Sequence, residues 1–203
     1  MPIEIEISYK LPDATTKKRL LADQTIADSR IGDPRTIAMT AEYYDTPAHA
    51  MREKNTTLRK HTEDGESFVS VRAGNPGDNA RTVWECPGSD ISSAIRTLTD
   101  MGAPRELLEA AAQEGFIARG RFEFTRFRET LMLDGDTSVE VNLDEGKILS
   151  ENKSAEFREV LIKLLFGDKT VMEEFAAVLE HKYLLLKEIS SKYERILRLI
   201  RTR

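Results

Sequence analysis

Cysteine and histidine, the residues of most zinc sites, are scarce in this sequence. Its 203 residues include one cysteine, Cys86, and three histidines. A single cysteine excludes a disulfide framework and a zinc site built from several cysteines. Three histidines spread along the chain argue against a multi-histidine metal site. Neither common kind of zinc site is therefore expected in this protein.

Long apolar runs and linkers are also missing, and a leader sequence is not expected. No stretch of about 18 apolar residues is present, so a membrane-spanning helix is not expected. The first ten residues, MPIEIEISYK, lack the basic and apolar regions of a secretory signal peptide. No Pro- or Gly-rich segment divides the chain, and 40% of the residues are hydrophobic. We therefore expect one cytoplasmic globular domain over residues 1–203, with no membrane partner.

Neither sign of charge is in large excess. The chain has 30 Lys and Arg against 35 Asp and Glu, a formal net charge of -5. An acidic balance argues against a general nucleic-acid binder, although it leaves room for a local basic cavity.

Alternation of apolar and polar residues predicts eight strands. At the start of the chain Ile3, Ile5 and Ile7 fall on one face of a strand, and the glutamates between them fall on the other. The Glu-Asp-Gly-Glu sequence that ends at residue 66 is typical of a hairpin turn. The predicted strands are residues 3–10, 35–45, 56–61, 67–73, 81–86, 117–133, 138–143 and 156–166, with further turns at 134–136 and 144–146.

Amphipathic segments between and after these strands predict helices. The first follows Asp13, a residue suited to the N-cap of a helix. The predicted helices are residues 13–30, 48–54, 90–101, 104–114, 168–187 and 190–201. Eight strands joined mostly by hairpins favour an α+β fold, a closed antiparallel eight-stranded barrel with helices packed on the outside.

The polar faces of these strands carry both arginines and carboxylates. Arg126 and Arg128 share one face of their strand, and Glu140 and Asp144 share one face of the next. Such faces either contact solvent or point into the interior of the barrel. Helices on the outside of a closed sheet would cover its apolar face, which favours the second interpretation.

An interior that holds several arginines beside several carboxylates has to be a binding cavity, because unpaired buried charge is too costly for a dry core. Arginine suits phosphate oxygens, which it can bind with two nitrogens at once. Carboxylates in such a cavity suit a hard divalent cation such as Mg²⁺ or Mn²⁺. Together these groups indicate phosphoryl-transfer chemistry.

Short charged motifs follow one another along almost the whole chain. They include EIEISYK at 4–10, YYDTP at 43–47, EVNLDEG at 140–146 and SKYER at 191–195. In this order and spacing they resemble the motifs of the CYTH, or triphosphate tunnel metalloenzyme, superfamily. That superfamily includes inorganic triphosphatases, thiamine triphosphatases and class IV adenylate cyclases. The resemblance implies a tunnel-shaped barrel that binds a triphosphate-containing small molecule together with Mg²⁺ or Mn²⁺.

The resemblance also implies roles for individual residues. The residues implied in catalysis are Glu4, Glu6, Lys10 and Glu159, and those implied as metal ligands are Glu4, Glu6, Asp144 and Glu159. The residues implied to bind substrate phosphate are Arg52, Arg59, His61, Arg72, Arg81, Arg126, Arg128 and Lys192. Glu85 and Glu140 are expected to position the arginines.

Five positions depart from the family motifs. Ser8 replaces the lysine of the first motif, and His61 and Val83 replace a basic residue and a glutamate. Leu161 and Lys163 stand where further carboxylates are expected. Lys10 lies on the same strand face as Ser8 and is the candidate to replace the missing lysine.

The predicted function is metal-dependent hydrolysis of inorganic triphosphate, or of a nucleoside or thiamine triphosphate, inside the barrel. The alternative is a barrel that binds polyphosphate or an organic phosphate without catalysis. An adenylate cyclase is a third interpretation, ranked lower because nothing in the sequence points to a site that would recognise a base. The resemblance is compatible with a homodimer.

Overall fold

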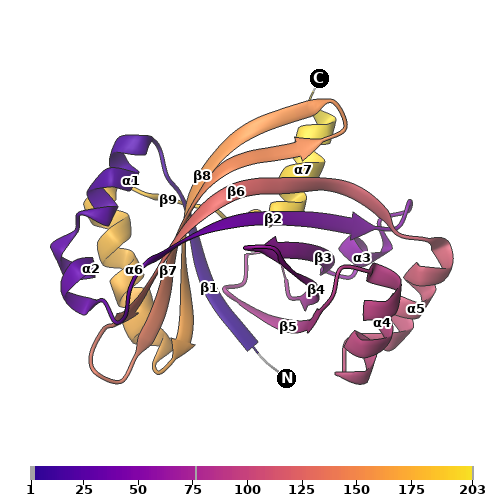
Figure 1. Cartoon of the computed structure of the whole chain (residues 1–203), viewed down its shortest axis with the longest axis horizontal. Helices are drawn as coiled ribbons and strands as arrows, with labels where there is room; N and C mark the ends of the chain where they lie inside the picture. The colour runs from indigo at the N-terminus through magenta and orange to yellow at the C-terminus, as the bar shows by residue number, and fades with distance from the viewer. Residues whose placement is uncertain (1–2, 76, 203) are drawn as a thin grey trace.

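A computed structural model describes residues 3–75 and 77–202, which form a barrel surrounded by helices (Figure 1). The strands are β1 (Ile3–Lys10), β2 (Arg35–Asp45), β3 (Thr56–Glu63), β4 (Glu66–Ala73), β5 (Ala80–Pro87), β6 (Ile117–Met132), β7 (Ser138–Ser150), β8 (Lys153–Phe166) and β9 (Leu186–Lys187). The helices are α1 (Ala14–Leu21), α2 (Gln24–Ser29), α3 (Ala50–Glu53), α4 (Ile91–Asp100), α5 (Arg105–Glu114), α6 (Lys169–Tyr183) and α7 (Lys192–Arg201).

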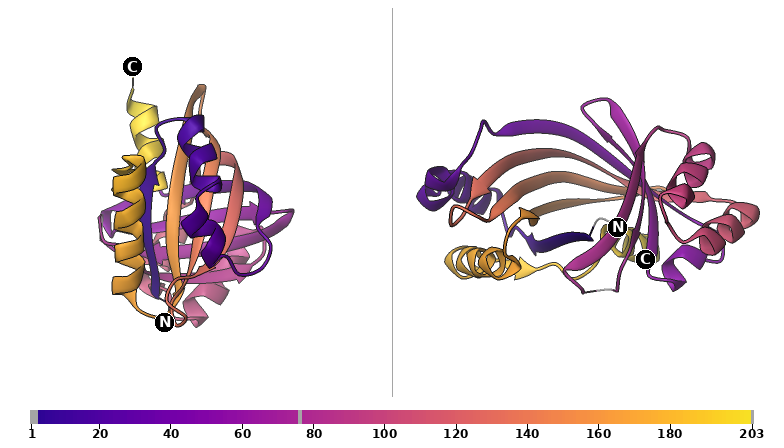
Figure 2. Two further views of the ribbon diagram at one scale, coloured as in Figure 1. Left: turned by 90° about the vertical axis from the view of Figure 1, so that its left-hand side faces the viewer. Right: turned by 90° about the horizontal axis from the view of Figure 1, so that it is seen from below.

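Eight of the strands close into an antiparallel barrel. Their order is β5-β4-β3-β2-β6-β7-β8-β1, and pairing of β1 with β5, for example Ile3 with Thr82, completes the ring. The short strand β9 lies outside this ring beside the end of β1, where Tyr9 pairs with Lys187. The curvature of the sheet is visible in Figure 2. The predicted α+β barrel of eight antiparallel strands is therefore confirmed.

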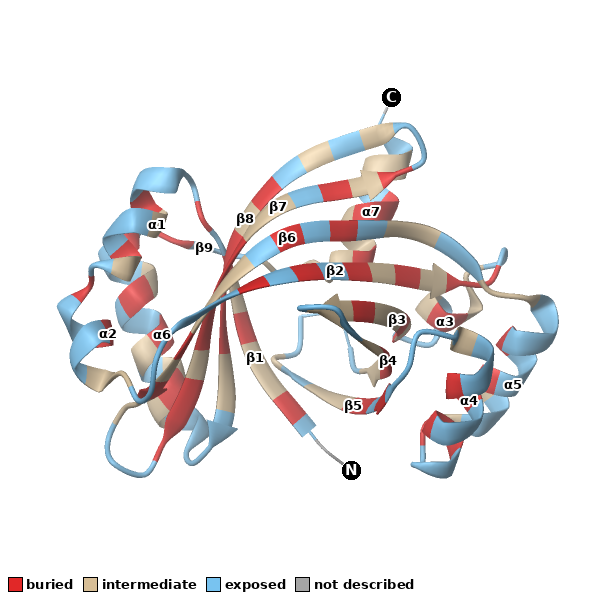
Figure 3. Cartoon of the chain, in the orientation of Figure 1, coloured by how far each residue is buried: buried red, intermediate tan, exposed pale blue. Residues whose placement is uncertain are grey.

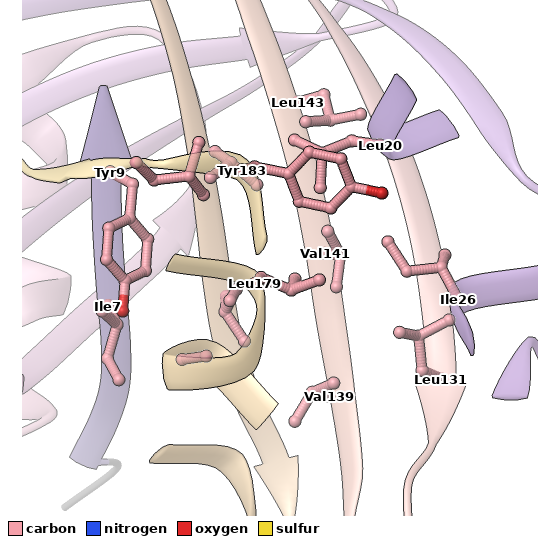
Figure 4. Close-up of a cluster of buried hydrophobic side chains, with 14 of the residues drawn as sticks. Ile7, Tyr9, Leu20, Ile26, Leu131, Val139, Val141, Leu143, Leu179 and Tyr183 are labelled. Atoms are coloured by element: carbon pink, nitrogen blue, oxygen red, sulfur yellow. The ribbon is translucent and has the colours of Figure 1, made fainter. Parts of the chain in front are cut away.

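Two apolar clusters cover the outside of the barrel at opposite ends of the molecule (Figure 1). In the first, α1, α2 and α6 pack on β1 and on β6 to β8, where Tyr9 and Val141 meet Leu179 (Figure 4). In the second, α3, α4 and α5 pack on β3 to β5 around Trp84 and Leu108. Buried and more exposed residues alternate along several strands (Figure 3). On β1, β3, β4 and β5 the charged side chains line the interior, whereas β2 turns apolar side chains such as Met39 and Tyr43 toward it.

The last helix, α7, packs against interior-facing side chains at one end of the barrel. Its residues Tyr193, Ile196 and Leu197 join Phe122 and Phe157 in a third buried cluster. Other members of this cluster, from β2 and β6, also line the central cavity. The C-terminal segment is therefore part of the wall of the cavity.

Helix boundaries differ from the sequence prediction at two places. The predicted helix 13–30 is two helices, because the buried side chain of Asp23 accepts hydrogen bonds from the backbone N–H groups of Thr25 and Ile26 and starts α2. The predicted helix 168–187 ends at Tyr183, because Leu184 has a left-handed backbone with φ of 51°. Within the described residues no helix is long and apolar enough to cross a membrane.

The predicted turn at 144–146 is wrong. Strand β7 runs through these residues and stays paired with β6 and β8, and the turn comes later, at Glu151, where φ is 50°. Gly146 is needed for packing instead. A Cβ atom on Gly146 would lie 2.5 Å from the Cα of Phe124 and 2.1 Å from the carbonyl oxygen of Glu123. The Asp-Glu-Gly sequence at 144–146 is typical of a turn, but in this protein its glycine allows close contact between β6 and β7.

We expect Gly146→Ala to destabilise the barrel by about 1–3 kcal/mol, because the added methyl group has to displace backbone atoms of β6. Denaturant unfolding of the two proteins measures the difference. Lys147→Ala, at the exposed neighbouring position, is the control. Equal stability of Gly146→Ala and the wild type would contradict the close packing of β6 on β7.

Candidate functional site

A cavity of about 1180 Å³ occupies the interior of the barrel. All eight barrel strands contribute to its wall, together with the segment that connects β9 to α7. Among the described residues, eleven lysines and arginines and nine aspartates and glutamates line it. The cavity therefore has more basic than acidic residues, although the whole chain has the opposite balance.

Arginines from three strands form one side of this cavity, which we call the arginine wall and define as Arg59, Arg72, Arg126 and Arg128. Burial lowers the pKa of Arg59, and the positive charge of Arg72 lowers it further. Repulsion between these guanidinium groups would be relieved by an anion. The arginine wall is therefore an electrostatic site for a negatively charged ligand.

Acidic side chains orient the arginine wall. Arg126 donates two hydrogen bonds of 2.7 Å to the two carboxylate oxygens of Asp144, which is fully buried. Arg128 donates to Glu63 at 2.7 Å and to the side-chain oxygen of Asn142 at 3.2 Å. These bonds restrict the guanidinium groups before any ligand binds, which lowers the entropic cost of binding.

The two glutamates of β1 face the same cavity and are both paired. Glu4 lies 3.3 Å from Arg72, and Glu6 lies 3.3 Å from Arg81. Burial would raise the pKa of Glu6, but the positive charges of Arg81 and Arg72 outweigh it and hold this pKa at about 2. Glu6 is therefore ionised at neutral pH.

Helix α7 supplies the basic partners of Glu159. The carboxylate of Glu159 accepts hydrogen bonds from Lys192 and Arg195, and the Lys192 ammonium also lies 3.6 Å from Asp144. Arg195 is in addition 3.9 Å from Glu188. This network ties the C-terminal helix to β7 and β8.

His61 is buried within the cavity wall and stacks on Phe68. Burial lowers its pKa, and the charges of Arg59, Arg72 and Arg126 take the pKa to about 2. Within the described residues, His61 Nδ1 and Arg72 Nε have no hydrogen-bond partner. Arg72 Nε is a donor, and His61 Nδ1 is one in one tautomer, so both can serve an anion.

The divalent cation that the fold family implies does not fit the predicted ligand set. Within the described residues, no three Asp, Glu, His or Cys side chains form a cluster that could hold a metal ion. Each of the four predicted carboxylates is instead paired with at least one basic side chain. Glu4 pairs with Arg72, Glu6 with Arg81, Asp144 with Arg126, and Glu159 with Lys192 and Arg195.

Most of the predicted site residues line this one cavity. Those that do are Glu4, Glu6, Arg52, Arg59, His61, Arg72, Arg81, Glu85, Arg126, Arg128, Glu140, Glu159 and Lys192. Asp144 lies behind Arg126, outside the cavity lining, and Arg52 is engaged by Glu194 at 2.6 Å.

Lys10 is placed differently from its prediction. Its side chain is 52% exposed, lies outside the cavity lining and is 3.5 Å from Glu188. Strand β1 leaves the interior at this point, so the shared face with Ser8 does not bring the ammonium of Lys10 into the cavity. The side chain of Lys10 therefore does not take the place of the missing lysine.

Several charged residues of the cavity received no role from the sequence, among them Lys163 and Arg195. Lys163 follows Glu159 and Leu161 on the inner face of β8, and alternation alone could have assigned it to the interior. Arg195 belongs to the SKYER motif, but the sequence does not show that it pairs with Glu159, which is far away along the chain. No local signal predicts such a contact.

Burial of His61 predicts a dependence of stability on pH. The unfolded chain takes up a proton on His61 below about pH 6.5, whereas the folded protein does so only near pH 2. This contribution to stability is present above about pH 6.5 and is lost as the pH drops below that value, with a loss of about 2 kcal/mol at about pH 5.

We expect His61→Gln to lose this part of the pH dependence, which denaturant unfolding at several pH values measures. His181→Gln, at an exposed position of α6, is the control and should keep the wild-type slope. A wild-type slope in His61→Gln would contradict a buried neutral histidine.

No protein-family model matches this chain, and no curated protein matches it in sequence. Solved structures do match in fold. A protein from Hippeastrum, proposed as an adenylyl cyclase and described as having a dominant triphosphatase activity, is 15% identical with a TM-score of 0.60, covering 98% of this chain and 96% of that one.

Two further structures agree. PH1819 from Pyrococcus horikoshii OT3 is 16% identical with a TM-score of 0.60, and covers 96% of this chain and 98% of its own. A proposed adenylate cyclase from Bacillus halodurans has the same identity and coverage and a TM-score of 0.56. This chain therefore shares the fold of these structures, which agrees at the level of the fold with the resemblance given by the motifs.

Proposed function

We propose that this protein binds the triphosphate group of a small molecule inside the barrel and hydrolyses it. The observation that carries the proposal is the arginine wall, four guanidinium groups from three strands that face one cavity together with Glu4 and Glu6. Guanidinium groups that repel one another in a buried site favour a ligand with several negative charges. A triphosphate chain has that charge and an extended shape suited to a tunnel.

The arginines have a defined task in such a reaction. Their donors would bind the non-bridging oxygens, hold the chain in one orientation and offset the charge that develops as the terminal phosphate bond breaks. The fold neighbour from Hippeastrum that is described as a triphosphatase supports hydrolysis as the reaction. Inorganic triphosphate and nucleoside or thiamine triphosphates are the candidate substrates, since a cavity of about 1180 Å³ has room for an attached organic group.

Binding without hydrolysis is the second candidate. The pairing of all four predicted metal ligands with basic side chains favours it, because carboxylates engaged in this way are not available to a cation that would assist hydrolysis.

Phosphate release separates the two candidates. Inorganic triphosphate, ATP and thiamine triphosphate are each incubated with the protein in Mg²⁺, in Mn²⁺ and in EDTA, and thermal unfolding is followed in parallel. Release of phosphate supports the hydrolase, and its loss in EDTA supports a metal-dependent one. Thermal stabilisation by triphosphate without release supports the binding protein. Neither release nor stabilisation would overturn both.

We expect Arg59→Met to weaken the affinity for inorganic triphosphate by about 10- to 100-fold, the effect of losing one charged hydrogen-bonding group. The stability of the unliganded variant should not fall, because the substitution removes the repulsion between Arg59 and Arg72. Titration calorimetry and thermal unfolding measure the two effects. Arg105→Met, at an exposed position of α5, is the control, and an unchanged affinity in Arg59→Met would contradict the arginine wall.

A further inference from the structure

A lysine stands among the carboxylates of the cavity. Lys163 of β8 is in register with Glu6 on β1 and with Glu140 on β7, and these three side chains line the same cavity. The Lys163 ammonium lies 4.0 Å from a carboxylate oxygen of Glu4. Lys163 therefore brings a positive charge to the part of the interior where negative side chains from two strands gather.

The side chain of Lys163 is accessible from the cavity. It is 37% exposed, whereas the side chain of Glu4 is 8% exposed. An exposed ammonium on a flexible side chain can change partners at little cost. A ligand oxygen that enters the cavity can therefore take the place of Glu4 as the partner of Lys163.

The charges around Lys163 favour binding of an anion over binding of a divalent cation. A divalent cation that binds Glu4 and Glu6 has to displace Arg72 and Arg81 from them while Lys163 stays near. Like charges that are brought this close together repel one another. The same basic groups attract an anion, which does not have to displace their positive charge from the site. The cavity is thus arranged for a polyanion that arrives without a metal.

We propose that the cavity binds its triphosphate as the free anion, with no divalent cation, and that Lys163 supplies the positive charge a cation would otherwise bring. This inference rests on the proposed binding of triphosphate. It concerns recognition only, and it assigns Lys163 as a binding residue.

Titration calorimetry with inorganic triphosphate in EDTA and in excess Mg²⁺ tests the inference. The wild type should bind at least as tightly in EDTA as in Mg²⁺, because Mg²⁺ in solution lowers the concentration of the free anion. Binding in Mg²⁺ but not in EDTA would overturn the inference and leave triphosphate binding standing. Binding in neither condition would overturn the proposed function itself.

Variants at position 163 test the role of this lysine. Lys163→Glu should weaken binding in EDTA by at least about 10-fold, and Mg²⁺ should restore part of the affinity, since a new carboxylate joins those of Glu4, Glu6 and Glu140. Binding of Mn²⁺ alone, followed by electron paramagnetic resonance, should be detectable in Lys163→Glu and weaker by about 10-fold or more in the wild type.

Lys163→Met removes the charge without adding a carboxylate, and it should weaken binding in EDTA with no rescue by Mg²⁺. It keeps the test open if Lys163→Glu does not fold. Lys147→Met is the matched control, because Lys147 is an exposed lysine that lies outside the central cavity. Wild-type affinity of Lys163→Met in EDTA would overturn the assignment of Lys163.

Discussion

Pairing of opposite charges inside a closed sheet is the constraint on which the interior of this protein depends. A barrel whose apolar faces are covered by helices has to place its polar faces inside, and charged groups there need partners. Asp144 shows the consequence, because its fully buried carboxylate accepts hydrogen bonds from two nitrogens of Arg126. Glu159 is matched in the same way by Lys192 and Arg195. The carboxylates of the site thus hold the basic side chains in place.

The same constraint makes some family-like motif residues structural. Asp45, from the YYDTP segment, is fully buried and accepts hydrogen bonds from the backbone of Met51 and Arg52 and from the Tyr193 hydroxyl. This carboxylate joins the end of β2 to α3 and α7. Helix α7 carries Lys192, which lines the cavity. Asp45 does not line the cavity, but it helps to position Lys192 through α7.

The balance of charge in the cavity connects the fold to the proposed chemistry. Each carboxylate that could hold a metal is already paired with a basic side chain. Lys163 adds a further positive charge next to Glu4. A ligand anion meets an excess of basic side chains in the cavity lining, whereas a divalent cation has to compete with the basic groups bound to the carboxylates. Recognition of a polyanion therefore follows from the arrangement more directly than binding of a metal.

Alternation along the strands determined much of this protein from the sequence alone: the barrel, which side chains face its interior, and so the arginine wall together with Glu4 and Glu6. It did not determine where β1 leaves the interior, which places Lys10 outside the cavity, or why Gly146 is a glycine. Tertiary structure also decided the partners of each charge, such as Arg195 for Glu159. Alternation is a property of neighbouring residues, whereas the pairing of charges depends on distances between strands and helices that only the closed barrel sets.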